Sequence, residues 1–315
     1  MRVGIVGAGT CGLYLAWKLS EKGEQVSVFE KRDIIGKEVC SGLFSERIFD
    51  FIPPSTKLVQ NKINECLIHF PKKVLKIKFR QKFFVMSHFE LDNLLANLAK
   101  PAGAKIVLNS NIMRSDFTKL KDDFDCLIGC DGAMSQTRKS LDLPDLEFKL
   151  GIQGFSFEND SAHFVETWPT KNGFLWKIPQ REKIEYGIIE EPKMARNIFD
   201  EFVKKCNVKP ETMRSAVIGQ GLVVSSDTKV ALCGEAAGLT KPWSGGGVIW
   251  GLTAADLLLK NFPDFIKYQI ELKKFFRRQI VLSKIAKKIF YFLGFNSPWF
   301  LPGEFKIDGD FFYYD

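Results

Sequence analysis

The sequence contains few of the residues that bind metals or form disulfide frameworks. Only three of its 315 residues are histidines, and its seven cysteines follow no repeated spacing. A metal site requires clustered ligands, such as CxxC with histidine partners, so no metal is expected. The odd number of cysteines predicts free thiols in a reducing, cytoplasmic compartment. The chain opens directly on a predicted strand, so we expect no signal peptide.

Long hydrophobic runs and internal repeats are also missing. No apolar run approaches the roughly 20 residues that span a bilayer. Hydrophobic residues still make up 45% of the chain, which is enough for a substantial core in two domains. The net charge is +8, which suits acidic partners such as phosphorylated small molecules or anionic lipid. Nucleic acid is not expected, because no motif that reads it is recognisable.

The chain begins with the pattern of a nucleotide-binding turn. A Val- and Ile-rich strand leads into Gly7, Gly9 and Gly12, which form GxGxxG, and a helix follows. The first glycine permits a tight turn, the second admits a pyrophosphate, and the third lets the helix pack on the strand. The amides at the start of that helix favour an anion. The alternative is a structural glycine turn in another βαβ unit.

A carboxylate ends the second predicted strand. Glu30 follows "QVSVF" and stands eighteen positions after Gly12, where it accepts hydrogen bonds from ribose hydroxyls. An acid here disfavours the 2′-phosphate of NADP. It does not separate NAD from FAD.

Three later segments decide between those two cofactors. Residues 124–141 form a strand followed by Asp131-Gly132, and residues 227–259 form a strand, a glycine-rich turn and a helix opening at 245–247. Residues 89–112 form a helix followed by a strand. In this order the motifs resemble FAD-dependent oxidoreductases of the glutathione reductase superfamily, hydroxylase-like branch, over roughly residues 1–260.

The resemblance implies FAD and the residues that hold it. The Asp-Gly segment would run beside the pyrophosphate, an acid would bind the ribitol, and a helix N-terminus would point at the flavin, where it stabilises the anionic reduced form. The implied cofactor-binding residues are Gly7, Gly9, Gly12, Glu30, Lys31, Cys40, Ser41, Gly42, His88, Asp131, Gly132, Gly234, Glu235, Gly246, Gly247 and Val248.

Two short segments are similar to the geranylgeranyl reductase family within that branch. "IIGKEVCSGLFSERI" matches its Gly…Cys-x-Gly loop, in which Cys40 would supply a proton near the flavin. "FLWKIP" matches its aromatic-x-Trp-x-Phe-Pro motif, which would line a tunnel for an isoprenoid tail. The substrate-binding residues implied are Phe174, Trp176, Ile178, Pro179 and Pro242. The alternatives are a buried cysteine that only packs and an ordinary sheet core.

This chain departs from the family at two cofactor positions. Glu235 stands where an Asp is usual, and His88 stands where an Arg usually helps to hold the phosphates. A protonated His88 would keep that contact. Because no second GxGxxG occurs, the electron donor is expected to bind transiently, as NAD(P)H or a reduced carrier.

The predicted fold is α/β, with a Rossmann-like FAD-binding domain, an antiparallel-sheet substrate domain and a C-terminal helical segment. The FAD-binding domain is assigned to residues 1–57, 86–148 and 224–262, and the substrate domain to 58–85 and 149–223. Residues 263–315 form the helical segment. Its apolar residues recur at 265, 268, 272, 275, 282, 286, 289 and 293, with lysines and arginines between them. Such a helix either lies on the inner face of an anionic membrane or packs its stripe on the FAD-binding domain.

The leading prediction is an FAD-dependent reductase of isoprenoid C=C bonds in prenyl lipids, resembling the enzymes of archaeal membrane-lipid biosynthesis. Hydride would come from flavin N5 with coupled protonation. The first alternative is a flavin monooxygenase on the same scaffold. The second is a non-catalytic prenyl-lipid-binding protein that has lost productive flavin, because of His88 and Glu235.

Overall fold

The chain divides into two compact units in a computed structural model, which describes residues 1–36 and 39–312. The first unit comprises Met1–Glu38, His88–Glu147 and Gly219–Ile280, and the second comprises Val39–Ser87, Phe148–Ile218 and Val281–Asp315. The units differ most from the predicted domains at two places. Residues 39–57 lie in the second unit because residues 43–45 pair with residues 83–85 of its sheet. Residues 263–315 are not separate, because they divide between both units.

The first unit is built on a five-stranded parallel sheet, which confirms the Rossmann-like prediction. The strand order is β13-β7-β1-β2-β6. The strand of residues 2–6 is central in this order, and its Val3 and Ile5 side chains therefore have no exposed surface. The strands are β1 (Arg2–Val6), β2 (Gln25–Phe29), β6 (Lys105–Val107), β7 (Cys126–Gly129) and β13 (Val230–Leu232).

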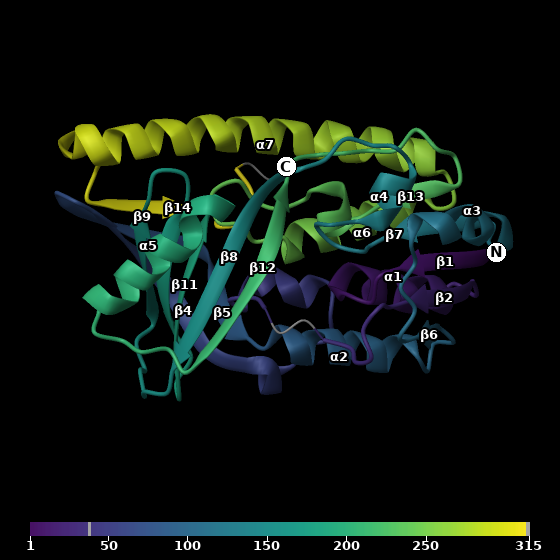
Figure 1. Cartoon of the computed structure of the whole chain (residues 1–315), viewed down its shortest axis with the longest axis horizontal. Helices are drawn as coiled ribbons and strands as arrows, with labels where there is room; N and C mark the ends of the chain where they lie inside the picture. The colour runs from purple at the N-terminus through teal and green to yellow at the C-terminus, as the bar shows by residue number, and fades with distance from the viewer. Residues whose placement is uncertain (37–38, 313–315) are drawn as a thin grey trace. The chain divides into compact units, whose positions relative to one another are not determined.

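Helices follow these strands in the order that the motifs predicted (Figure 1). The helix after the first glycine turn begins directly behind β1, and the helix of residues 89–99 precedes β6 as expected. The helices are α1 (Thr10–Glu21), α2 (His88–Ala99), α3 (Arg114–Asp123), α4 (Gln136–Ser140), η3 (Gly234–Ala237), α6 (Val248–Asn261) and α7 (Phe265–Asn296), the last of which continues into the second unit.

The second unit contains a nine-stranded sheet in the order β12-β8-β11-β10-β9-β4-β5-β14, with β3 paired to β5. The sheet is mainly antiparallel, as predicted, although β4 runs parallel to β9 and β14 parallel to β5. The strands are β3 (Leu43–Ser45), β4 (Val59–Phe70), β5 (Lys73–Met86), β8 (Glu147–Ser156), β9 (Phe164–Pro169), β10 (Phe174–Pro179), β11 (Ile184–Glu190), β12 (Thr212–Gln220) and β14 (Glu304–Ile307). The helices are η1 (Glu46–Asp50), η2 (Thr56–Leu58), α5 (Pro192–Lys205) and η4 (Pro298–Phe300).

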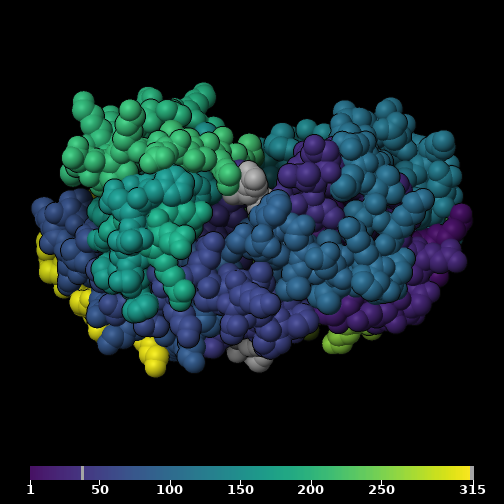
Figure 2. Space-filling model, turned by 90° about the horizontal axis from the view of Figure 1, so that it is seen from below, coloured from purple at the N-terminus to yellow at the C-terminus, as the bar shows by residue number. Residues whose placement is uncertain are grey.

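The two faces of this sheet have different neighbours. On one face Leu175 and Ile188 pack against Phe199 of α5, and Figure 2 shows the α5–β12 segment, in teal and green, at the surface of the unit. On the other face Trp176 and Ile178 pack with strands β4, β5 and β9. Trp176 and Ile178 therefore share one face of β10, as their alternation predicts.

The predicted apolar stripe of the C-terminal helix is only partly buried. Phe265, Tyr268 and Leu272 are buried within the first unit. Leu282 and Ile289, two further members of the stripe, are 37% and 56% exposed, so the stripe does not pack along its whole length. In this part of α7 the side chains that pack on β4 and β5 are Leu293, which belongs to the stripe, and Phe290, which does not, because the buried face of a helix drifts around its axis over many turns.

Candidate functional site

Two glycines of the first turn are required by the close approach of backbone segments. A Cβ on Gly12 would lie 2.0 Å from the Gly7 carbonyl oxygen, and one on Gly7 would lie 2.9 Å from the Asp131 Cα. The N-cap of α1 is Gly9, and no side chain caps the helix there. The N-terminal amides of α1 therefore face a position with no competing side-chain acceptor, which suits a phosphate.

Glu30 is fixed beside that turn by three hydrogen bonds. The carboxylate is 5% exposed and accepts from the Ala8 N–H at 2.8 Å. Its other oxygen accepts from the Arg32 N–H at 3.1 Å and from Arg32 Nε at 3.0 Å. Lys31, which is also predicted at the cofactor, is exposed. Sequence reasoning missed Arg32, whose guanidinium also donates to the Gly36 carbonyl at 2.8 Å.

His88, the first residue of α2, contacts Thr10, the first residue of α1. The Thr10 hydroxyl donates to Asp92 Oδ1 at 2.7 Å, so its oxygen accepts from His88 Nε2 at 2.8 Å. The His88 tautomer is thereby assigned as Nε2–H, because a hydroxyl has a single proton to donate. His88 and Asp92 are both buried, so the group ties α2 to the first residue of α1.

The Asp-Gly turn lies close to Glu235, the acid that is predicted to bind the ribitol. A Cβ on Gly132 would lie 3.9 Å from Glu235 Oε2, and one on Gly247 would lie 3.7 Å from Glu235 Cγ. Glu235 thus lies between the Asp-Gly turn and the N-cap of α6, where no side chain caps the helix. Val248 is the first residue of α6, and Gly246 precedes its N-cap. The positive end of α6 and an acid are brought together in one unit.

The Asp131 side chain fixes the conformation of the turn that follows it. Its carboxylate accepts from the Ser135 hydroxyl at 2.6 Å and from the Thr137 N–H at 2.9 Å. Burial raises the pKa of Asp131, and these hydrogen bonds oppose the rise. Arg138 is fully buried and donates to the Ala236 carbonyl at 3.0 Å, which joins this turn to η3. Asp131 therefore shapes the turn that presents Gly132.

Three thiols gather beside the same turn, which the spacing of the cysteines did not predict. Cys233 hydrogen-bonds with Cys11 and with Cys130. A Cβ on Gly234 would lie 2.8 Å from the Cys11 sulfur. The hydrogen bond to Cys233 and burial raise the pKa of Cys11, so it is a neutral thiol at physiological pH. The cluster packs α1 closely against η3.

The Cys40 loop lies in the second unit and is pinned to the end of β5. The Gly42 N–H donates to the Cys40 sulfur at 3.4 Å, and the Met86 N–H donates to the Gly42 carbonyl at 2.8 Å. Gly42 has φ +65°, and a Cβ there would lie 2.1 Å from the Met86 carbonyl oxygen. Only glycine fits this position. Cys40 and Ser41 are half-buried.

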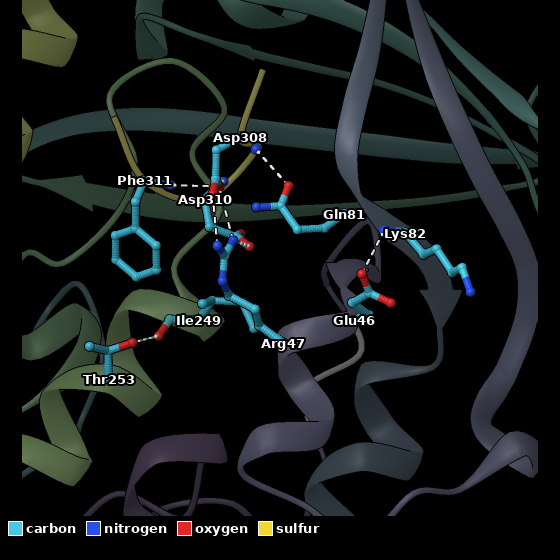
Figure 3. Close-up of polar contacts among 10 residues, drawn as sticks. Glu46, Arg47, Gln81, Lys82, Ile249, Thr253, Asp308, Asp310 and Phe311 are labelled. Carbon is cyan, nitrogen blue, oxygen red and sulfur yellow. Dashed lines mark hydrogen bonds and ion pairs between the residues drawn. The ribbon is translucent and has the colours of Figure 1, made fainter. Parts of the chain in front are cut away.

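An ion-pair network fixes the segment that follows the Cys40 loop. Arg47 donates to both oxygens of Asp308, at 2.7 and 2.9 Å, and to Asp310 Oδ2 at 3.1 Å (Figure 3). The Phe311 ring lies under the guanidinium, 5.5 Å from its carbon. These bidentate and stacked contacts fix η1 to the segment after β14.

A buried carboxyl group stands beside the predicted substrate strand. Glu185 is fully buried and accepts from Trp176 Nε1 and from Gln180 Nε2, both at 2.8 Å. Burial is the largest of the effects that raise the pKa of Glu185 to about 8, and the hydrogen bond from Trp176 opposes the rise. Trp176 and Glu185 are therefore in direct contact, and Glu185 is neutral at pH 7.

The other predicted substrate residues are only partly brought together. The Phe174 and Trp176 rings lie 5.8 Å apart, whereas Ile178 and Pro179 are buried in the same strand. Pro242 is buried in the first unit, in the segment before α6. One signal could have revealed Glu185, because an acid inside the apolar run "IEYGII" is unusual in a buried strand.

Comparisons with known proteins agree with this architecture. Residues 5–53 match a family described as an NAD(P)-binding Rossmann-like domain. The digeranylgeranylglycerophospholipid reductase of Methanothrix thermoacetophila is 25% identical over 293 residues, which cover 79% of this chain and 74% of the relative. That of Methanosphaera stadtmanae is 24% identical over 329 residues, covering 89% and 80%.

A solved structure has the same fold. The geranylgeranyl bacteriochlorophyll reductase-like protein of Thermoplasma acidophilum superposes with a TM-score of 0.76 at 17% identity, over 91% of this chain and 86% of that one. A flavin-dependent halogenase of Xanthomonas campestris superposes with a TM-score of 0.67 at 14% identity, covering 89% and 76%. The chain therefore has the fold that these proteins share, and it resembles the geranylgeranyl reductases.

Proposed function

We propose that this chain, which resembles the geranylgeranyl reductases, is an FAD-dependent reductase of isoprenoid C=C bonds in prenyl lipids. The observation that carries the proposal is the Cys40 loop, pinned to the end of β5, in the same unit as the apolar face of β10 that carries Trp176 and Ile178. The relatives named as reductases of digeranylgeranylglycerophospholipids support a prenyl-lipid substrate. The reductant is proposed to be NAD(P)H or a reduced electron carrier that binds transiently.

The cofactor is FAD, and the first unit provides the groups that it requires. The α1 N-terminus would hold the pyrophosphate, Glu30 the adenosine ribose and Glu235 the ribitol. His88 fits this site, because its Nε2–H already reaches the first residue of α1. The carboxylate of Glu235 replaces that of the usual Asp, and the N-terminus of α6, which is the positive end of the helix, lies next to it.

Bound reduced FAD supplies the hydride. The chain contributes orientation and a proton, because an unactivated alkene cannot stabilise the carbanion that hydride addition alone would leave. We propose that Cys40 delivers this proton to one alkene carbon. Phe174, Trp176 and Ile178 would hold the isoprenoid tail by apolar contact, so that no polar group is left unsatisfied.

The flavin monooxygenase alternative has support from the halogenase fold likeness, but that likeness is no stronger than the one to the reductase-like protein. A stopped-flow experiment separates the two. Anaerobic addition of a geranylgeranyl lipid to the chemically reduced protein should restore the absorbance of oxidised flavin. Reoxidation by oxygen alone, with NAD(P)H consumption stimulated by an aromatic compound, would favour the monooxygenase instead. A colourless protein that still binds prenyl lipid would favour a non-catalytic binder.

Glu30→Gln is expected to weaken FAD binding by roughly 10- to 100-fold, because it removes a charged acceptor of ribose hydroxyls and the partner of Arg32. Titration of the apoprotein with FAD, followed by flavin fluorescence, measures the change. Asp33→Asn is the matched control, since Asp33 is an exposed acid three residues away. Equal affinity in the Glu30 variant and the control would contradict the assignment.

A further inference from the structure

The C-terminal part of α7 carries an unusual exposed apolar face. Within the second unit, Ile285, Ile289 and Phe292 are 51%, 56% and 64% exposed. They recur at intervals of three and four residues, so they lie on one side of the helix. Trp299 and Phe300 of η4, the next element, are 66% and 72% exposed. We call these five residues the α7–η4 surface.

The stretch of chain that carries this surface contains basic residues and no acidic ones. Residues 272–303 contain no Asp or Glu, whereas they include seven Lys or Arg. Lys284 and Lys288 are exposed in the same turns as Ile285 and Ile289. Helices that combine a basic face with exposed Trp and Phe lie at bilayer surfaces, where the rings enter the interface and the lysines meet anionic head groups.

We propose that the α7–η4 surface docks this protein on an anionic lipid bilayer. Within residues 1–36 and 39–312, no helix is both long enough and apolar enough to cross a membrane, so the contact proposed is peripheral. The charge pattern favours a bilayer over a second copy of this chain, because a dimer would bring two lysine-rich faces together. A prenyl-lipid substrate that resides in a bilayer would be reached from such a position.

Flotation with vesicles of phosphatidylglycerol and phosphatidylcholine tests the docking. The protein should float with anionic vesicles and lose binding at high salt. Trp299→Ser with Phe300→Ser should weaken binding at least about tenfold, and Lys284→Gln with Lys288→Gln about tenfold or more. Phe157→Ser is the control, because Phe157 is 60% exposed in another loop of the same unit.

Two results would overturn the docking proposal. One is the absence of flotation with anionic vesicles. The other is a self-association, measured by sedimentation, that the Trp299 and Phe300 variants abolish while vesicle binding stays unchanged. Neither result depends on catalytic activity, so both can be read even if the proposed reaction is wrong.

Discussion

Cys40→Ala is expected to slow lipid reduction at least about 100-fold while FAD stays bound, because positioned general acids contribute roughly 100- to 10,000-fold to rates. The sulfur accepts a hydrogen bond from the Gly42 N–H, in a loop pinned to the end of β5, so its position is fixed by the fold. Steady-state turnover and the flavin content of the purified variant measure the two parts of the prediction.

Cys206→Ala is the control for this substitution. Cys206 is an exposed thiol in the same unit and has no place in the proposed site. If Cys40→Ala reduces the lipid at the wild-type rate, Cys40 is not the proton donor. If the variant loses its flavin, the loop binds the cofactor and the proton must come from another group.

Glu185→Gln is expected to change the pH dependence of stability. The pKa of Glu185 is about 8 in the folded protein, against an ordinary value of 4.5. Between these values the folded state holds a proton that the unfolded state has released, so the stability of the wild type falls as pH rises from 4.5 to 8. Over this pH range the wild type loses up to about 5 kcal/mol of its free energy of unfolding. Glu185→Gln does not lose this contribution, because a glutamine side chain does not titrate.

Urea unfolding at a series of pH values measures this difference. The stability of Glu185→Gln minus that of the wild type should increase from pH 4.5 to 8 and stay constant above pH 8. Glu182→Gln should show no such trend, because Glu182 is exposed. A difference that is flat across this range would show that the carboxyl group is ionised in the folded protein at neutral pH.

Local pattern was sufficient to predict the first unit. The glycine spacing, the strand before it and Glu30 after the second strand all lie within 30 residues, and their geometry follows from a single βαβ unit. The later Asp-Gly and Gly-rich segments were also predicted correctly as strand-turn-helix elements. Their convergence on Glu235 follows because parallel strands end at the same edge of a sheet.

Contacts between distant segments were not predictable in this way. The Cys11, Cys130 and Cys233 thiols come from three separate βα turns, so no sequence spacing reveals their cluster. Glu185 meets Trp176 only because β10 pairs with β11 in one register. The exposure of Ile289 depends on which face of a 32-residue helix packs on the sheet, and that face drifts along the helix.

The central claim is that this chain reduces an isoprenoid double bond, and the mass of the lipid tests it most directly. The flavin-loaded protein is reduced chemically without oxygen and incubated with a geranylgeranyl lipid, which is then weighed by mass spectrometry. The account predicts a gain equal to one or more hydrogen molecules, absent with Cys40→Ala over the same interval. An unchanged lipid mass, with flavin bound and reduced, would contradict it.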